Sequence, residues 1–149
     1  MGLDMYLYVR RWVSSTDEKY SDITSALGFS DKYDQSNLVM VEGMIAYWRK
    51  ANAIHNWFVN NVQDGVDNCE TYNVSKTQLL QLREVCQRSI VNRDNGQPVE
   101  LETVSGFFFG STEYDEGYWD DLQSTIEQID VAMTIDKPDE VDYLYHASW

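Results

Sequence analysis

The chain has 149 residues, 43% of them hydrophobic and 24% charged, a length and composition that predict one folded domain over residues 1–149. Acidic residues outnumber basic ones by 25 to 11, which gives a net charge of −14. A surface of this sign repels nucleic acids and anionic membranes and attracts basic surfaces, so we expect no direct binding to nucleic acid and no membrane association. The excess is concentrated in residues 111–149, where 11 acids accompany one base, Lys137.

The two cysteines, Cys69 and Cys86, have no partner cysteine or histidine at the spacing of a zinc site, so we predict no metal. The sequence contains no glycine-rich phosphate loop, and we predict no cofactor. Neither a leader-like apolar segment nor a run long enough to span a membrane is found, which predicts a cytoplasmic protein with reduced thiols.

The first 65 residues predict two strands and two helices. Apolar residues alternate with polar ones over 3–9, which is typical of a half-buried strand. A short helix ending at Gly28 follows, in an otherwise irregular segment. A β-branched, apolar run predicts a second strand near 38–47, with Gly43 marking a bulge. Helical spacing then extends over 49–65.

The middle of the chain predicts a turn and a helix. Polar residues over 67–74 are typical of a turn. Ser75 and Gln78 have the spacing of a capping box, which predicts the start of a helix at this point. The Asn95-Gly96 dipeptide is a strong turn signal and ends that helix.

The last third predicts a strand, a helix and a strand. Residues 104–111, VSGFFFGS, are too short for a helix between glycines and predict a buried strand. Thr112 is the expected N-cap of a long helix, whose first turns carry several carboxylates. Pro138 ends this region, and 141–149 predict a final strand. The predicted fold is α+β: a small, mainly antiparallel sheet of about four strands, with three main helices packed on one side.

Three stretches, AYWRKANAIHNWFV, DGVDNC and GFFFGSTEYDEGY, resemble recurring segments of small proteins of unassigned function from bacteriophages and prophages. The start, GLDMYLY, is similar to theirs too. The resemblance covers most of the chain but contains no chemical motif. It implies a phage accessory protein of the host cytoplasm that binds or blocks a host component, for example in an anti-defence role.

The first functional hypothesis is an acidic interaction protein. It would dock on a basic surface of a host protein, with carboxylates standing in for the phosphates of a nucleic acid and with aromatic anchors. The candidate partner-binding residues are Asp115, Glu116, Tyr118, Trp119, Asp120 and Asp121. Further carboxylates of this surface would be Asp130, Asp136, Asp139 and Glu140. The sequence leaves open whether the chain forms a homo-oligomer.

The alternative is a binder of a nucleotide-like anion. On a helix, Trp48, Asn52 and His55 would share one face, with Trp48 as a stacking surface and Arg49 as a fork donor. The loop at 14–37 would close the pocket. The full candidate set is Trp48, Arg49, Lys50, Asn52, His55 and Tyr114.

Two more ordinary interpretations accompany the alternative. Arg49 and Lys50 would pair with the acidic segment after Phe109, and the acids at 113–116 would serve the helix start. A hydrolase that uses His55 and a carboxylate is a third function, without catalytic residues that the sequence identifies.

Overall fold

Two long strands, β1 (Asp4–Val13) and β2 (Val39–Arg49), pair along their whole length at one side of the sheet. The computed structural model describes residues 2–29, 38–135 and 138–149. The alternation in β1 has the predicted consequence, because Met5 and Leu7 are fully buried while Tyr6 and Tyr8 lie half-buried on the opposite face.

The sheet has four strands in the order β2-β1-β4-β3, and every neighbouring pair is antiparallel. The two further strands are β3 (Thr71–Val74) and β4 (Asp142–Ser148). The prediction of a turn over 67–74 is therefore wrong for its last four residues. Their pairing with β4 comes from a segment about 70 residues away, which outweighs the local turn signals.

The bulge in β2 lies at Ile45 and not at Gly43. Leu7 pairs with Ala46 and Tyr8 pairs with Met44, so Ile45 is the extra residue. Gly43 is in regular register with Val9, and the predicted Gly43 bulge is wrong.

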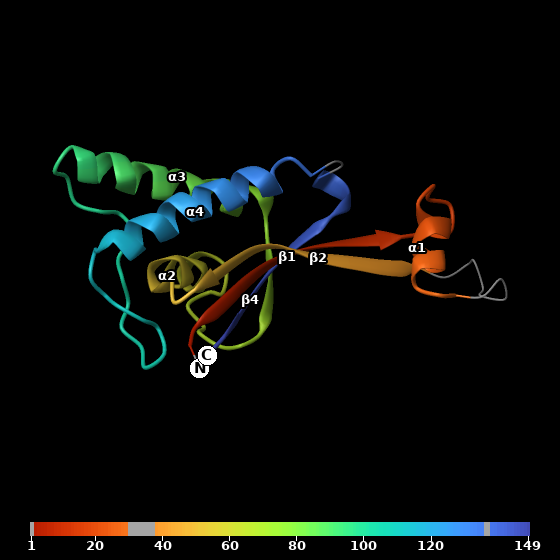
Figure 1. The fold of residues 1–149 in the computed structure, drawn as a ribbon, viewed down its shortest axis with the longest axis horizontal. Helices are drawn as coiled ribbons and strands as arrows, with labels where there is room; N and C mark the ends of the chain where they lie inside the picture. Colours follow the sequence, from red (N-terminus) through yellow and green to blue (C-terminus); the bar gives the residue numbers. More distant parts are fainter. Residues whose placement is uncertain (1, 30–37, 136–137) are drawn as a thin grey trace.

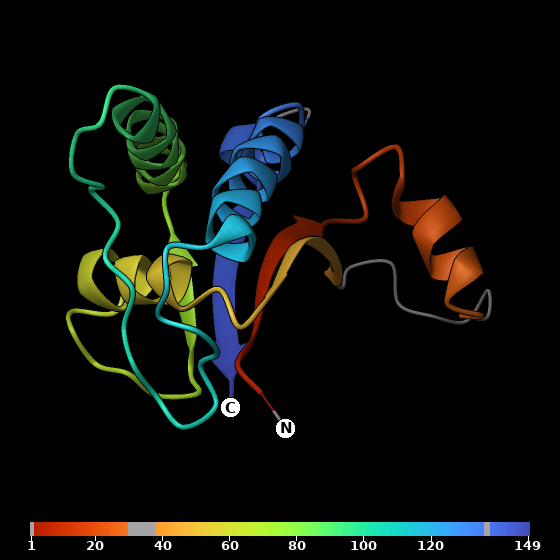
Figure 2. The ribbon, with the colours of Figure 1, turned by 60° about the vertical axis from the view of Figure 1, so that its left-hand side comes forward.

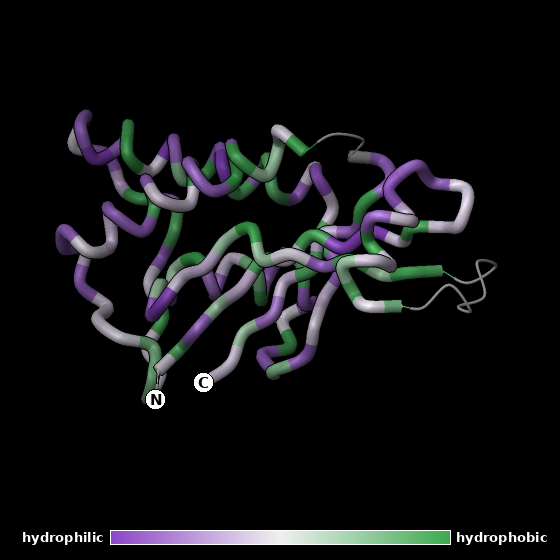
Figure 3. Tube along the Cα trace, turned by 45° about the vertical axis from the view of Figure 1, so that its right-hand side comes forward, coloured by the Kyte–Doolittle hydropathy of each residue, from purple (hydrophilic) through white to green (hydrophobic). Residues whose placement is uncertain are grey.

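Helices α2 (Asn52–Asn61), α3 (Lys76–Asp94) and α4 (Glu116–Ala132) cover one face of the sheet (Figures 1 and 2). Hydrophilic and hydrophobic segments alternate along α3 and α4 in Figure 3, as expected for helices that bury one side. Over the described residues, no helix combines the length and the apolar character that a membrane span requires. The α+β fold with three main helices on one side is confirmed.

The start of α3 follows the predicted capping box. The Ser75 hydroxyl accepts a hydrogen bond from the Gln78 backbone N–H, and the Gln78 side chain accepts one from the Ser75 backbone N–H. The helix ends at Asn95 and Gly96, where Gly96 has a φ of 67°. Both ends of this helix are readable from the sequence because their signals are local.

The end of the β1–β2 ribbon projects beyond the rest of the sheet and carries the short helix α1 (Tyr20–Ala26), seen at the right of Figure 1. Val13, Tyr20 and Val39 form a small buried cluster there, separate from the main core, with Ile23 packed against it. A single 3-10 turn, Pro138–Glu140, directly precedes β4 in the chain.

The segment with three phenylalanines is a loop, so the predicted strand over 104–111 is wrong. Phe109 is 8% exposed and anchors the loop, whereas Phe107 is 95% exposed at its tip. Gly106 allows this turn, because a Cβ at that position would lie 2.6 Å from the Phe109 ring. The long helix that follows begins at Glu116, with Asp115 as N-cap, so the predicted Thr112 cap is also wrong.

Candidate functional site

A sharp bend separates β2 from α2 and divides the predicted Trp48–His55 cluster. The strand continues to Arg49, and Lys50 adopts a left-handed φ of 59° before the helix begins at Asn52. The prediction of a helix from 49 onward is wrong at its start, and Trp48 does not share a helix face with Asn52 and His55. A close approach fixes the bend, because a Cβ on Gly110 would lie 2.9 Å from the Lys50 Cβ.

Trp48 is a core residue of the sheet. It is 3% exposed and pairs with Met5 of β1. Its indole Nε1–H donates to the Thr125 hydroxyl of α4 at 2.8 Å. Since the ring is enclosed, it offers no face on which a ligand could stack.

Asn52 holds the loop between α3 and α4 in place. Its Nδ2 donates to the carbonyl oxygens of Phe109 (3.1 Å) and Ser111 (2.7 Å), and its Oδ1 accepts from the Val104 N–H (3.0 Å). The side chain is 3% exposed. Asn52 thus supplies the partners that a neighbouring strand would otherwise supply to this loop.

His55 is buried and lies between the buried Tyr145 and the exposed Asp67 in a hydrogen-bonded series. Its Nδ1 is 2.7 Å from the Tyr145 hydroxyl, and its Nε2 is 3.0 Å from Asp67 Oδ1. Burial lowers the pKa of His55, against the opposing effect of Asp67, which favours a neutral ring that donates from Nε2 and accepts at Nδ1. Burial also raises the pKa of Tyr145 well above its ordinary value. With 1% exposure, the imidazole has no surface for a substrate.

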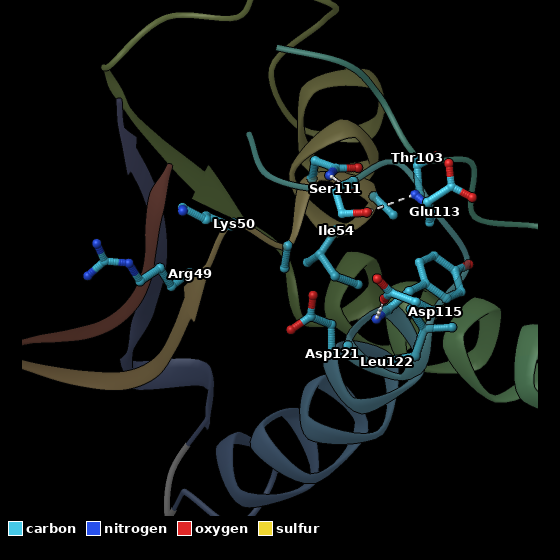
Figure 4. A pocket seen from close by; sticks show the side chains of 14 residues that line it. Arg49, Lys50, Ile54, Thr103, Ser111, Glu113, Asp115, Asp121 and Leu122 are labelled. Carbon is cyan, nitrogen blue, oxygen red and sulfur yellow. Dashed lines mark hydrogen bonds between the residues drawn. The ribbon is translucent and has the colours of Figure 1, made fainter. Parts of the chain in front are cut away.

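Arg49, Lys50 and Asn52 do line a cavity, together with carboxylates from the start of α4 (Figure 4). The cavity has a volume of about 250 Å³. Its walls come from the β2–α2 bend, the loop before α4 and the first turns of α4. The lining residues are Arg49, Lys50, Ala51, Asn52, Ala53, Ile54, Thr103, Ser111, Glu113, Asp115, Gly117, Tyr118, Asp121 and Leu122.

Asp121 is the most perturbed carboxylate of this cavity. Burial raises its pKa from 3.8 to about 6, with further contributions from the charges of Asp120 and Asp115. Among the described residues, no side chain or backbone N–H donates to its carboxylate and no cation lies within ion-pair distance. Asp115 differs, because its Oδ1 accepts from the Tyr118 N–H as the N-cap of α4.

Five carboxylates lie close together in the sequence at the start of α4, and we call them the α4 acidic patch. Its members are Glu113, Asp115, Glu116, Asp120 and Asp121. The ion pairs within the described residues all lie elsewhere, so none neutralises this patch. They are Arg10–Glu42, Arg11–Asp17, Arg11–Glu140, Arg49–Asp4, His55–Asp67, Arg83–Asp130, Arg88–Glu84 and Arg88–Glu100.

The carboxylates beyond the patch do not extend it evenly. Arg83 pairs with Asp130, and Arg11 pairs with Glu140. Asp139 lies in the 3-10 turn, which comes after the end of α4 and not at its start. Asp136 lies outside the described residues. Glu127 and Asp142 also form no ion pair, so five of the eight described C-terminal acids without an ion pair lie at the start of α4.

The three aromatic candidates beside the patch differ in exposure. Tyr114 is 45% exposed and packs edge-on against Tyr118. Tyr118 is 6% exposed and donates its hydroxyl to the Leu101 carbonyl at 2.7 Å, so it is a core residue and cannot be a surface anchor. Trp119 is half-buried, and the Arg93 guanidinium lies 4.7 Å from the centre of its ring.

The loop at 14–37 does not contribute to the cavity through its described part. Residues 14–29 belong to the α1 end of the β1–β2 ribbon, and none of them lines the cavity. Residues 30–37 lie outside the described residues.

The thiols and the metal-binding side chains give no second site. Both cysteines are free; Cys69 is exposed, and burial raises the pKa of Cys86 to about 12. Among the residues that the structure describes, no three His, Cys, Asp or Glu side chains are grouped so that they could hold a metal ion.

Sequence reasoning missed several contributors to the candidate site. Asp67 and Tyr145 were not expected beside His55, and the apolar cavity wall at Ile54 was not expected beside Asp121. Tyr145 lies 90 residues from His55 and Asp67 lies 12 residues from it, beyond the reach of a helix-face argument, so no local signal indicated either contact. Comparison of the chain with family models, curated proteins and solved structures gives no match.

Proposed function

We propose that this chain is an acidic interaction protein that binds a basic surface of another protein through the α4 acidic patch. The observation that carries the proposal is the distribution of ion pairs. The arginines that form them pair with acids outside the patch, while the five patch carboxylates form no ion pair within the described residues. Clustered charge of one sign accelerates association with a surface of the opposite sign.

The neighbourhood of the patch supports a protein partner. A shallow hollow beside the patch is lined by Asp115, Glu116 and Asp120 together with Tyr114, Trp119 and Arg93. Aromatic side chains beside charges are typical of interface anchors. Phe107, at the tip of the adjoining loop, adds an exposed apolar side chain. If the phage resemblance reflects the origin of the chain, the partner is a host protein that this contact blocks.

The binding of a nucleotide-like anion has less support. Trp48 and His55 are enclosed in the core, and the remaining cationic candidates share their cavity with three carboxylates that would repel an anion. A volume of about 250 Å³ is also below the range of roughly 300–1,000 Å³ that is typical of ligand pockets. A hydrolase would need His55 to reach solvent.

The proposal is tested by capture from a bacterial host lysate at low and at high salt. The triple variant Glu113→Gln, Glu116→Gln, Asp120→Asn removes three patch charges, of which only Glu113 lines the cavity, and leaves the Asp115 cap and the Asp121 carboxylate unchanged. We expect the wild-type chain to retain a partner at low salt and to lose it at high salt. At low salt, the triple variant should retain much less of this partner.

The matched control is Glu18→Gln, Asp64→Asn, Glu70→Gln. It removes the same number of charges from exposed residues that form no ion pair within the described part of the chain. The control should capture the partner as the wild type does. Equal loss of partner capture in both variants would show that net charge alone controls binding and would refute a role for the patch. Equal retention of the partner by both variants would also refute the proposal.

A further inference from the structure

The outer edge of β2 is closed in one part and open in another. β2 lies at the edge of the sheet, with β1 as its strand neighbour. At Tyr47 the edge is closed by α4, because the Tyr47 backbone N–H donates to Gln128 Oε1 at 2.7 Å. Over residues 39–44, no described side chain bonds to the backbone groups that point away from β1. We call residues 39–44 the open edge; the bulge at Ile45 separates it from the closed part.

The open edge lacks the features that commonly prevent an edge strand from pairing with another chain. Such edges are usually very short, or they carry prolines and lysines. The opposite edge of the sheet follows this rule, because β3 has only four residues. The open edge has six residues without proline or lysine. Its one charged residue, Glu42, forms an ion pair with Arg10 at 2.7 Å, so the open edge is locally neutral.

The ribbon is also only two strands wide at this point. Beyond Arg10, β1 pairs with β2 alone. A pair of strands is marginally stable in water and gains stability from a third strand or from a covering helix. Here α1 covers one face through the small cluster around Tyr20, and the edge itself stays open. A further strand at the open edge would therefore stabilise the part of the sheet that has the fewest partners.

Exposed apolar side chains are concentrated at the same place. Met40 and Met44 of β2 are 45% and 58% exposed, and Trp12, the cross-strand neighbour of Met40, is 54% exposed. By the alternation of the strands, these three side chains lie on the face opposite the helices. Exposed apolar groups that gather in one area are typical of a protein–protein contact.

The charge of this region favours a second copy of the chain over a basic partner. The open edge has no uncompensated charge, although the whole chain has a net charge of −14. Figure 1, in which the longest axis is horizontal, shows the start of α4 toward the left and the ribbon end at the right. Two copies that meet at their ribbon ends would keep their acidic patches far apart. A second copy also supplies a neutral strand of the same length with the same apolar side chains.

We propose that the open edge pairs antiparallel with the open edge of a second copy, so that two four-stranded sheets become one continuous sheet. The Met40, Met44 and Trp12 side chains of both copies would form one apolar band across the junction. The contact is closed at two copies, because each copy uses the same edge. This surface is separate from the α4 acidic patch, so the dimer leaves the patch free for the partner of the proposed function.

The first test is sedimentation equilibrium over a range of concentrations, at low and at high salt. Pairing over a short edge buries less area than a stable interface does, so we expect a dissociation constant on the order of 1–100 µM. Both copies are acidic, and salt screens their repulsion. Raising the salt from about 50 mM to about 500 mM should therefore tighten the dimer by about twofold or more. Capture through the patch has the opposite salt dependence.

A matched pair of double variants tests the surface. Met40→Lys with Met44→Lys introduces lysines at the open edge, where those of the two copies would meet. Val91→Lys with Val131→Lys changes the net charge equally at exposed positions of α3 and α4. We expect the first pair to weaken the dimer by about tenfold or more, and the second by less than about twofold. All four positions are exposed, and unchanged far-UV circular dichroism would confirm that both variants fold.

Hydrogen exchange identifies the backbone that pairs. The wild-type chain is compared in a dilute and in a concentrated sample. In the concentrated sample, amides of residues 39–44 should exchange about fivefold or more slowly, because pairing suppresses the local opening of the ribbon end. Amides of β3 (Thr71–Val74) serve as the control and should exchange equally in both samples.

Four results would overturn the inference. They are a single-chain mass up to about 1 mM, masses beyond two chains, equal dimerisation of the two double variants, and a dimer without added protection at residues 39–44. Protection of these residues that arises only with another protein would assign the open edge to that protein and would also overturn the second copy. Failure of the dimer leaves the proposed function intact, because the latter is tested by variants of the patch and by the opposite effect of salt.

Discussion

Replacing Asp121 by asparagine is expected to make the free protein more stable at neutral pH. Burial raises the pKa of this carboxyl from 3.8 to about 6, which means that the folded state holds the proton more firmly than the unfolded state does. Between these two values stability falls as the pH rises, and above about 6 the cost of the ionised group is complete. Asparagine has no charge to bury and removes this cost.

The magnitude follows from the shift. A difference of roughly two pKa units corresponds to about 3 kcal/mol, since one unit is about 1.4 kcal/mol. Because Asp121 keeps some contact with solvent, we expect a gain of about 1–3 kcal/mol in the free energy of unfolding at pH 7. At about pH 3 and below the aspartate is largely protonated in both states, because this lies below both pKa values, and most of the gain should disappear.

The assay is urea unfolding, followed by tryptophan fluorescence, of the wild type, Asp121→Asn and Asp120→Asn at a series of pH values. Asp120 is exposed, so its variant should stay within about 0.5 kcal/mol of the wild type at each pH. A destabilised Asp121→Asn protein at pH 7, or a gain that is independent of pH, would show that the carboxylate has a partner in solution and would refute the reasoning.

The remaining predictions concern the loop between α3 and α4. Asn52→Ala leaves its three backbone partners unpaired and is expected to cost about 2–4 kcal/mol in chemical denaturation; a loss below about 1 kcal/mol would contradict the role of the amide as a clamp. Gly106→Ala places a Cβ against the Phe109 ring and should cost about 1–3 kcal/mol, measured in the same way, whereas a neutral effect would mean that the ring moves freely. Phe107→Ser should change the melting temperature very little, because this side chain is 95% exposed and its loss should cost less than about 0.5 kcal/mol; a clear decrease would show that it packs inside.

The parts of the fold that the sequence predicted are those with local signals. The capping box at Ser75 lies within four residues, and the alternation of β1 needs only its own side chains and one buried face. The class of fold follows, because the number of strands and amphipathic helices restricts how the layers can stack.

The failures share a different origin, which is pairing between distant residues. Phe109 reads as part of a strand until Asn52, 57 residues earlier, takes up the backbone groups around it. Thr71 to Val74 read as a turn until β4 pairs with them. Neither partner leaves a mark in the segment that it changes, so tertiary contact overrides local propensity.

Only some residues of the candidate site were predicted from the sequence. Arg49, Lys50 and Asn52, three of the predicted ligand-binding residues, do line a cavity. Most of the acids at the start of α4, which form no ion pair within the described residues, were also predicted as one group. The bend at Lys50 was not foreseen, because a left-handed lysine carries no sequence signature. That bend removes Trp48 from the site and brings the apolar wall of α2 beside Asp121.

The division of the apolar interior has a consequence for how the molecule opens. Only Asp4 to Arg10 of β1 pair with a strand on both sides. Beyond Arg10, the end of the β1–β2 ribbon is stabilised by its own small buried cluster around Tyr20. Arg11, which holds Asp17 and Glu140 together, is its ionic link to the segment before β4. Amide protons at this end should exchange with solvent through local opening, at a much lower free energy than those of Met5 or Leu7, and the ribbon end with α1 would behave as a separate cooperative unit.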